Sequence, residues 1–157
     1  MSKQIDQERF TTVLFYLLDE TFKSHHGIYL DKGTSLFETL AGIDAAQASI
    51  PVGGKCASLA AQVAHVTFYL EVLERYILAQ DAGKVDWGEI WRTIEAVTPE
   101  EWRRLQEQLK GTYQRVLDML HSQDWEGETP IGGALAIVVH TAYHLGEIRQ
   151  ALCILKP

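Results

Sequence analysis

The sequence predicts an all-α protein, a four-helix bundle built from a single domain over residues 1–157. Four segments carry apolar residues at intervals of three and four, the spacing that gives a helix one apolar face. Capping and turn residues separate these segments, and no repeat, linker or low-complexity stretch divides the chain. A globular domain of this length buries about 70% of its unfolded surface, so it needs no disulfide or metal to fold.

The first long helix is expected over residues 4–23, ending near His25, His26 and Gly27, where the glycine acts as a helix stop. Its apolar residues at helical spacing are Phe10, Val13, Leu14, Leu17, Leu18 and Phe22. The two adjacent histidines point in different directions on a helix, and we expect both to be exposed.

Short elements are expected between the first two long helices. Ser35 and Glu38 have the spacing of a capping box, in which the two side chains satisfy free backbone N–H groups. They predict a short helix that ends at Gly42. Residues 44–47 open a further turn, and a proline and two glycines place a loop at 51–55.

The second long helix is expected to begin between Cys56 and Ser58 and to continue to Gln80. One face of this helix carries Ala61, Ala64, His65, Phe68, Val72 and Tyr76. Residues 81–97 then form a connector, in which residues 86–89 could form one or two helical turns.

The third and fourth long helices share one start signal. Residues 98–101 supply a threonine N-cap, a first-turn proline and a capping-box glutamate. The apolar residues that follow are Trp102, Leu105, Leu109, Tyr113, Val116, Leu117 and Leu120. Residues 129–130 repeat the threonine and proline for a last helix that continues to Leu155. Gly132 and Gly133 each weaken its first turn by roughly 1 kcal/mol relative to alanine, which predicts close helix contact or loop packing there.

Charge and cysteine content exclude several classes of protein. The chain has 21 acidic and 14 basic residues, a net charge of −7 and no basic run, which argues against nucleic-acid binding. Cys56 and Cys153 form neither a C-x-x-C pair nor a disulfide framework, as expected in a reducing compartment. The sequence opens on no apolar signal segment, and charges break its hydrophobic runs before about 20 residues. We therefore expect a cytoplasmic protein with no membrane span.

Three of the six histidines are expected to face the protein interior. His140 and His144 lie four residues apart on the last helix, so both rings project from one face and reach a single ion. That face continues through Ile137, Ile148, Ala151 and Leu155. His65 lies on the apolar face of the second helix, where the inner faces of the two helices meet.

These histidines predict a metal site at His65, His140 and His144. Zinc, nickel, iron and copper all accept imidazole, and three protein ligands leave a position for water, which is typical of a catalytic site. The alternative is a set of hydrogen-bonded core histidines. The other histidines, His25, His26 and His121, stand at helix ends and receive no role.

Glu147 follows His144 by three residues and shares its face of the helix. It could be a fourth ligand, a general base acting on bound water, a residue that holds a histidine ring in place, or an exposed partner of Arg149. The chain has no H-E-x-x-H pattern, so zinc-protease chemistry is not supported. It also lacks the G-x-S-x-G, Walker and dinucleotide-binding patterns.

The two cysteines are weaker candidates. Cys56 stands at a helix start, where free N–H groups lower the pKa of a thiol, and so it is a candidate nucleophile. A capping or small packing role is favoured, because no histidine adjacent in sequence activates it. Cys153 lies on the last apolar turn, and we expect it to pack in the core.

Two motifs resemble those of the DinB/YfiT-like superfamily of four-helix-bundle proteins. One is Ala61-Gln62-Val63-Ala64-His65, and the other is His140-Thr141-Ala142-Tyr143-His144-Leu145-Gly146-Glu147-Ile148-Arg149-Gln150. The resemblance covers essentially the whole chain. It implies a divalent metal, most often zinc or nickel, held by His65, His140 and His144 with positions open to water, and it implies a homodimer.

The resemblance also carries expectations about chemistry. Such proteins include metal-dependent S-transferases and isomerases that use low-molecular-weight thiols such as bacillithiol or mycothiol, and members with no known activity. Glu147 stands where many relatives have glutamine, which adds an anionic ligand or base. The leading hypothesis is a metalloenzyme that deprotonates a water or a thiol for hydrolysis or for thiol transfer to a small electrophile. The competing hypothesis is a non-catalytic module, either a metal-bound stress-response bundle or a protein whose core histidines satisfy one another.

Overall fold

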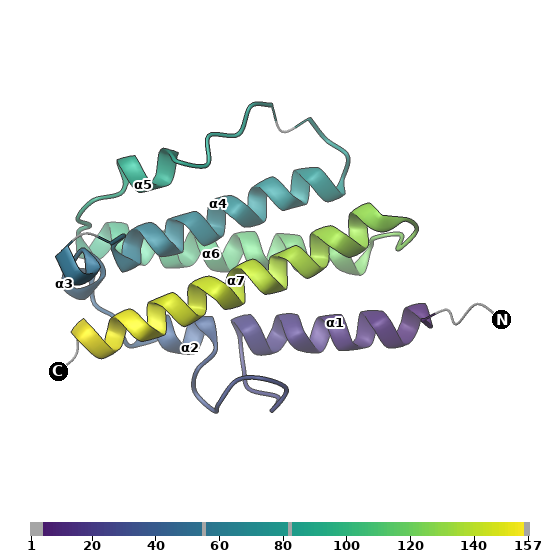
Figure 1. Ribbon diagram of the computed structural model, residues 1–157, viewed down its shortest axis with the longest axis horizontal. Coiled ribbons are helices and arrows are strands. Elements are labelled where there is room, and N and C mark those ends of the chain that lie inside the picture. Colours follow the sequence, from purple (N-terminus) through teal and green to yellow (C-terminus); the bar gives the residue numbers. More distant parts are fainter. Residues whose placement is uncertain (1–4, 55, 82, 156–157) are drawn as a thin grey trace.

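The computed structural model describes residues 5–54, 56–81 and 83–155, and all regular structure in these ranges is helical. The all-α prediction is therefore confirmed for this part of the chain. Four long helices lie side by side (Figure 1): α1 (Gln7–Phe22), α4 (Leu59–Ile77), α6 (Pro99–His121) and α7 (Glu128–Leu155). The short elements between them are α2 (Leu36–Ala41), α3 (Ala45–Ala48), the 3-10 turn η1 (Val52–Gly54) and α5 (Glu89–Thr93).

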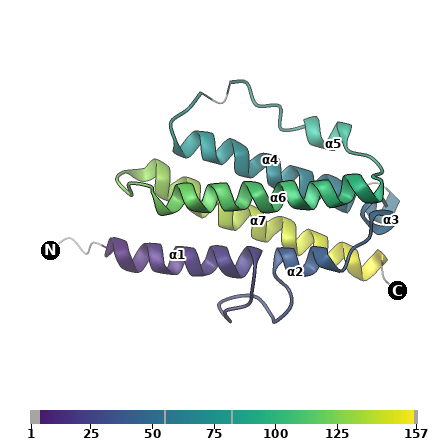
Figure 2. The same ribbon diagram turned by 180° about the vertical axis from the view of Figure 1, so that it is seen from behind.

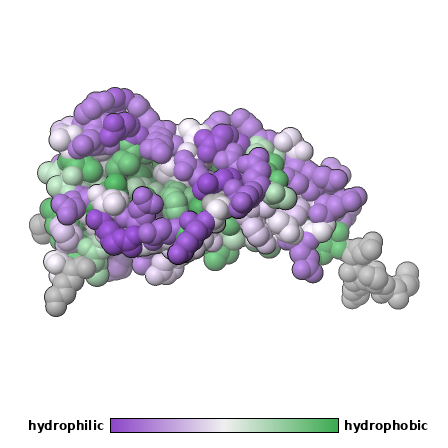
Figure 3. Space-filling view, turned by 90° about the horizontal axis from the view of Figure 1, so that it is seen from above, coloured by the Kyte–Doolittle hydropathy of each residue, from purple (hydrophilic) through white to green (hydrophobic). Residues whose placement is uncertain are grey.

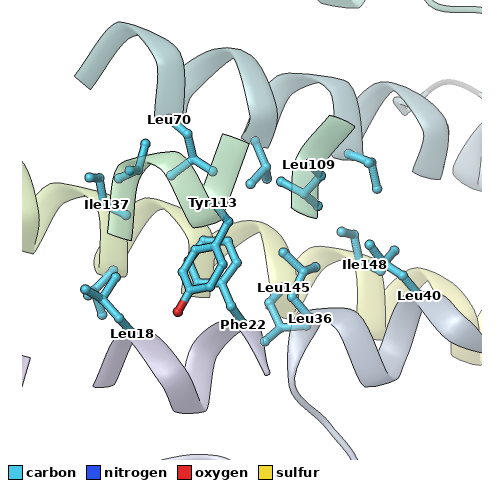
Figure 4. Packing of buried hydrophobic residues seen from close by; sticks show 14 of the residues in the cluster. Leu18, Phe22, Leu36, Leu40, Leu70, Leu109, Tyr113, Ile137, Leu145 and Ile148 are labelled. Atoms are coloured by element: carbon cyan, nitrogen blue, oxygen red, sulfur yellow. The ribbon is translucent and has the colours of Figure 1, made fainter. Parts of the chain in front are cut away.

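The connector that carries α5 sets the direction of the long helices. It returns along α4 to the end at which α4 begins, so α4 and α6 run in the same direction (Figures 1 and 2). Helix α7 then runs back, packing against α4 and α1, while α4 also packs against α6. The apolar core lies between these helices (Figure 4) and includes Leu18, Phe22, Leu36, Leu70, Leu109, Tyr113, Ile137 and Leu145.

The predicted capping signals are confirmed at two helices. Ser35 and Glu38 form a capping box at α2, and Thr98 and Glu101 form one at α6, where Pro99 occupies the first turn. The turn predicted at residues 44–47 is α3, which has a capping box of its own. These local signals succeed because each cap is made by residues within one turn of the helix start.

The end of the first helix agrees with the predicted end at Lys23 to within one residue, but Gly27 is not its stop. Helix α1 ends at Phe22 with Lys23 as its C-cap, and its predicted start at Gln4 lies outside the described residues. The segment after the helix is held by Glu20, a completely buried residue whose carboxylate accepts hydrogen bonds from the backbone N–H groups of residues 26–29 at 2.8–3.2 Å. The chain after α1 folds back around this carboxylate and does not extend the helix.

Other expectations about faces and boundaries were also wrong. Val13 and Tyr76 are exposed, and Phe68 is only half-buried, because each lies at the edge of the buried face of its helix. Helix α7 begins at Glu128, so Thr129 lies within its first turn and is not the N-cap. The helical turns predicted at 86–89 form instead as α5, which begins only at Glu89. Lys55, the last residue of the loop predicted at 51–55, lies outside the described residues.

The close helix contact predicted at Gly133 is confirmed. A Cβ atom there would lie 2.5 Å from Ile77 Cγ1, so the absence of a side chain lets α7 approach α4. Gly133→Ala is therefore expected to destabilise the protein by about 1–3 kcal/mol, measured by chemical denaturation.

The adjacent glycine supplies a matched control. Gly132 is exposed, and a Cβ atom added to it would meet no other atom within 4 Å. Gly132→Ala should stabilise the protein by about 0.5–1 kcal/mol through helix propensity alone. Equal effects of the two substitutions would show that the α4–α7 distance does not depend on Gly133.

Candidate metal site

Three of the predicted site residues meet between α4 and α7. His65 projects from α4, and His140 and His144 project from successive turns of α7. His65 and His144 are buried, with 7% and 4% of their surface exposed, and His140 is half-buried. The exposed residues His25, His26 and His121 take no part in this group.

The three rings point the same nitrogen toward one another. His140 Nε2 lies 3.2 Å from His65 Nε2 and 3.2 Å from His144 Nε2. One ligand atom from each residue lies within 4.8 Å of the others, which is close enough for the three histidines to hold a metal ion. A ring of three imidazole nitrogens suits a divalent transition metal, because such metals accept neutral imidazole as a ligand.

The second ring nitrogen of His144 fixes its tautomer. Nδ1 lies 2.5 Å from Gln62 Oε1 and 2.9 Å from Glu147 Oε2, and both oxygens are acceptors. Nδ1 therefore carries the proton and donates it, which leaves a lone pair on Nε2, facing His140. Four roles were considered for Glu147, and this contact fits one of them, in which the carboxylate holds a histidine ring in place. Its carboxylate accepts a hydrogen bond from His144, and the described residues show no ion pair between Glu147 and Arg149.

Burial keeps the histidines neutral. Burial, and then the neighbouring His144, lower the pKa of His65 to about 4, although Glu147 opposes this shift. Burial, and then His144 and His65, lower the pKa of His140 to about 3. Burial also lowers the pKa of His144 against the opposing effect of Glu147. All three rings therefore hold free lone pairs at neutral pH, as a metal ligand requires.

Aromatic rings from α4 and from the connector pack around the histidines. Tyr69 stacks on His140 with a centroid distance of 3.4 Å and an interplanar angle of 6°. Trp91 of α5 lies 4.3 Å from the ring of His65, and Trp87 lies 5.7 Å from Tyr69. Sequence reasoning missed Trp91 because it is distant in sequence, and it missed Gln62 although this residue lies three before His65 on the same helix face.

A cleft of about 1040 Å³ opens beside the histidines. His144 and Glu147 form one wall, Trp91, Ile94 and Glu95 form another, and Cys56, Ser58 and Gln62 lie at the start of α4. Figure 3 shows hydrophobic surface between hydrophilic segments at the end of the molecule that holds α3 and α5. The site therefore communicates with solvent through a partly apolar opening.

The packing roles predicted for the cysteines are wrong. Cys56 is exposed on the cleft wall, and Ser58, whose side chain accepts from Ala61 N–H, caps α4 in its place. Cys153 is also exposed, because the outer face of α7 carries it. The candidate role of Cys56 as a nucleophile stays a prediction.

The lowered pKa values predict metal binding in mild acid. An ordinary site of three histidines with pKa near 6.5 would lose affinity roughly 500-fold between pH 7 and pH 5.5, because protons compete for each nitrogen. Here the pKa values of about 4 for His65 and about 3 for His140 lie below this range. We expect the Kd for Zn²⁺ to rise by less than about tenfold over the same interval, measured by isothermal titration calorimetry. A rise of roughly 500-fold would contradict neutral, preformed ligands.

Comparisons of the chain with protein-family models, with curated proteins and with solved structures found no match. Membership of the DinB superfamily therefore stays a prediction from the two motifs. Helix α7 is long and apolar enough to cross a membrane, but core helices of globular proteins meet the same criteria, and much of α7 is buried against α4 and α1. The cytoplasmic location stays a prediction.

Proposed function

We propose that the protein is a metal-dependent enzyme with a DinB-like four-helix-bundle fold, acting on a small electrophilic substrate. His65, His140 and His144 would hold a divalent ion, zinc or nickel, and the attacking group would be a water or a low-molecular-weight thiol. The observation that carries the proposal is the convergence of three neutral Nε2 atoms beside a solvent-connected cleft.

The residues around the site support a catalytic arrangement. A divalent ion in such a site acts as a Lewis acid that lowers the pKa of a coordinated water or thiol. Glu147 and Gln62 orient His144, and Tyr69 fixes the plane of the His140 ring. Three protein ligands leave a position for an exogenous group, and His144 reaches the cleft from which that group would enter.

The charge of the cleft favours particular reactants. Among its described lining residues, Glu95 and Glu147 are acidic, and none is a lysine or an arginine. A thiolate bound at the ion would be neutralised by the ion's positive charge, but an anionic group elsewhere on a reactant would meet two carboxylates without a lysine or an arginine among the described lining residues. We therefore infer that the reactants are uncharged or cationic in the parts that contact the cleft walls away from the ion.

The first test of the proposed function is a direct assay with the loaded protein. Protein purified without a histidine tag is analysed for bound transition metals and is then loaded with Zn²⁺ or Ni²⁺. Each form is incubated with an aryl halide and either an uncharged or a carboxylate-bearing thiol, and with an aryl ester for hydrolysis. We expect metal-dependent turnover that prefers the uncharged thiol. Absence of copurifying metal, together with no binding below millimolar concentration, would refute the enzyme hypothesis.

The non-catalytic alternative also has an observation in its favour. The Nε2 atoms lie at hydrogen-bonding distance from one another, so the three rings could share a proton without any ion. Nδ1 of His65 and Nδ1 of His140 are buried without a partner among the described residues, and neither an ion at the Nε2 atoms nor mutual hydrogen bonding would change this. Metal titration separates the two hypotheses.

We further propose that the protein is a homodimer. The outer face of α7 exposes Leu135, Val139, Tyr143 and Ile154, and apolar residues gathered along one helix favour association. Sedimentation velocity measures this directly. A single species at the mass of one chain over micromolar concentrations would exclude the dimer.

A further inference from the structure

A second cavity lies between α1 and α6 and shares no residue with the metal cleft. Its volume is about 340 Å³. Phe15, Tyr16 and Asp19 of α1 form one wall, Tyr113 and His121 of α6 form another, and His26 closes it from the loop after α1. This volume is at the lower end of the range for pockets that bind small molecules.

Tyr113 lines this cavity and carries a buried, unpaired polar atom. The residue is 2% exposed, and its hydroxyl has no hydrogen-bond partner among the described residues. The ring is fixed by stacking on Phe22 at a centroid distance of 4.1 Å and by an edge contact with Phe37. Figure 4 shows the oxygen pointing toward α1, the helix that forms the opposite wall. A buried hydroxyl without a partner is unfavourable by roughly 1–3 kcal/mol, so a missing partner is expected in the cavity.

Asp19 supplies the complementary group. Its Oδ2 accepts a hydrogen bond from His26 Nε2 at 2.7 Å and one from Ser24 Oγ at 3.1 Å. Burial, and then the charge of Asp19, raise the pKa of Tyr113, so the phenol stays protonated and can donate. The cavity therefore offers one donor, the Tyr113 hydroxyl, and one acceptor, the Asp19 carboxylate.

The remaining walls are flat and aromatic. Phe15 stacks on His121 with a centroid distance of 4.0 Å and an interplanar angle of 16°, and Tyr16 contacts the edge of His26. Such surfaces favour a planar ring. Lys23 Nζ lies 5.2 Å from the centroid of the Tyr113 ring, but none of the described residues that line the cavity is a lysine or an arginine, and Asp19 adds a negative charge that disfavours a carboxylate or a phosphate.

We propose that this cavity binds a planar aromatic molecule that carries a neutral amide group. The amide carbonyl would accept the Tyr113 hydroxyl proton, and the amide N–H would donate to Asp19, while the ring would lie against Phe15 and Tyr16. A benzamide, or the amide edge of a nucleobase, has this chemistry. The site is independent of the metal site and of the activity proposed for it.

The experiment uses benzamide as the probe and the full chain as the receptor. Binding is followed by chemical-shift changes in ¹H–¹⁵N spectra, with benzoate and toluene as comparison probes. A fragment of this size is expected to bind with a Kd of about 0.1–5 mM. Benzamide should bind at least about tenfold more tightly than benzoate or toluene, because only benzamide offers an acceptor and a donor without a charge.

Variants identify the contacts. Tyr113→Phe removes only the unpaired oxygen and should weaken benzamide binding by at least about fivefold without unfolding the protein. Asp19→Asn should have an effect of similar size. Tyr76→Phe, at an exposed tyrosine of α4, is the matched control and should change nothing. His140→Ala should also leave benzamide binding unchanged.

Three results would overturn the proposal. These are no shift changes with benzamide at about 10 mM, equal binding to wild type and Tyr113→Phe, or benzoate binding as tightly as benzamide. If Tyr113→Phe alters only the free energy of unfolding, the hydroxyl is a packing defect and not a ligand contact.

Discussion

Replacing His140 by alanine is expected to weaken Zn²⁺ and Ni²⁺ binding by at least about 100-fold while the helices remain folded. His140 Nε2 is the atom that lies 3.2 Å from both other imidazole nitrogens, so its loss opens the centre of the site. The ring is half-buried, and its replacement leaves a small gap against Tyr69. Competition titration with a chromophoric chelator measures the affinity, and circular dichroism measures the helix content.

The matched control for this prediction is His25→Ala. His25 is exposed and lies apart from the three converging rings, so its loss should leave the affinity unchanged. The metal affinity of Gln62→Ala is expected to lie between those of His140→Ala and His25→Ala. Binding should weaken by about 10-fold, because the substitution removes one of the acceptors that orient His144. Undiminished affinity in His140→Ala would mean that any ion bound by the protein lies elsewhere.

Replacing Glu20 by alanine is expected to lower the free energy of unfolding by about 3–5 kcal/mol. The carboxylate is completely buried and accepts the N–H groups of four consecutive residues, 26–29. Alanine offers no acceptor in their place, and buried N–H groups without partners are strongly unfavourable. Urea denaturation measures the loss. Glu8→Gln, at an exposed glutamate of the same helix, is the control and should change stability by less than about 0.5 kcal/mol.

The same carboxylate predicts a pH dependence. Burial alone would raise the pKa of Glu20, but the four backbone N–H groups together lower it below its ordinary value. A carboxyl group whose pKa is lower in the folded state stabilises the protein fully above its unfolded pKa, near 4.3. That contribution is lost as the pH falls from this value through the folded pKa. Wild type should therefore lose stability below about pH 4.5, and Glu20→Gln should be weaker at neutral pH and less sensitive to acid. A parallel acid profile in the two proteins would contradict this origin.

The features that could be predicted depend on the helical spacing of apolar residues and on local capping signals. The four long helices and the capping boxes at Ser35 and Thr98 follow from residues within one or two turns of each other. The inward position of His65, His140 and His144 follows from the same spacing, because the apolar face of each helix carries the ring. Their convergence needed only that α4 and α7 be neighbours, which Gly133 permits by its close contact with Ile77.

Contacts between distant segments could not be predicted. Trp91 reaches His65 only because the connector returns along α4, and no local pattern specifies that course. The course of the chain after α1 depends on Glu20, whose four donors lie six to nine residues away in a loop without periodicity. The exposed cysteines show a further limit, because an apolar stretch at the end of a helix does not reveal which side faces solvent.

Trp91 beside the histidines and Trp87 beside Tyr69 give the protein an intrinsic fluorescence signal. Trp91 lies 4.3 Å from the His65 ring, and Trp87 lies against Tyr69, whereas Trp102 is held in the core by a hydrogen bond to the carbonyl of Ile43. Nickel and copper quench indole fluorescence at short range. An ion bound at His65 should therefore quench the emission of Trp91 more strongly than that of Trp102. Titrating the unlabelled protein in a fluorimeter would then follow occupancy in real time, with Trp91→Phe removing most of the response.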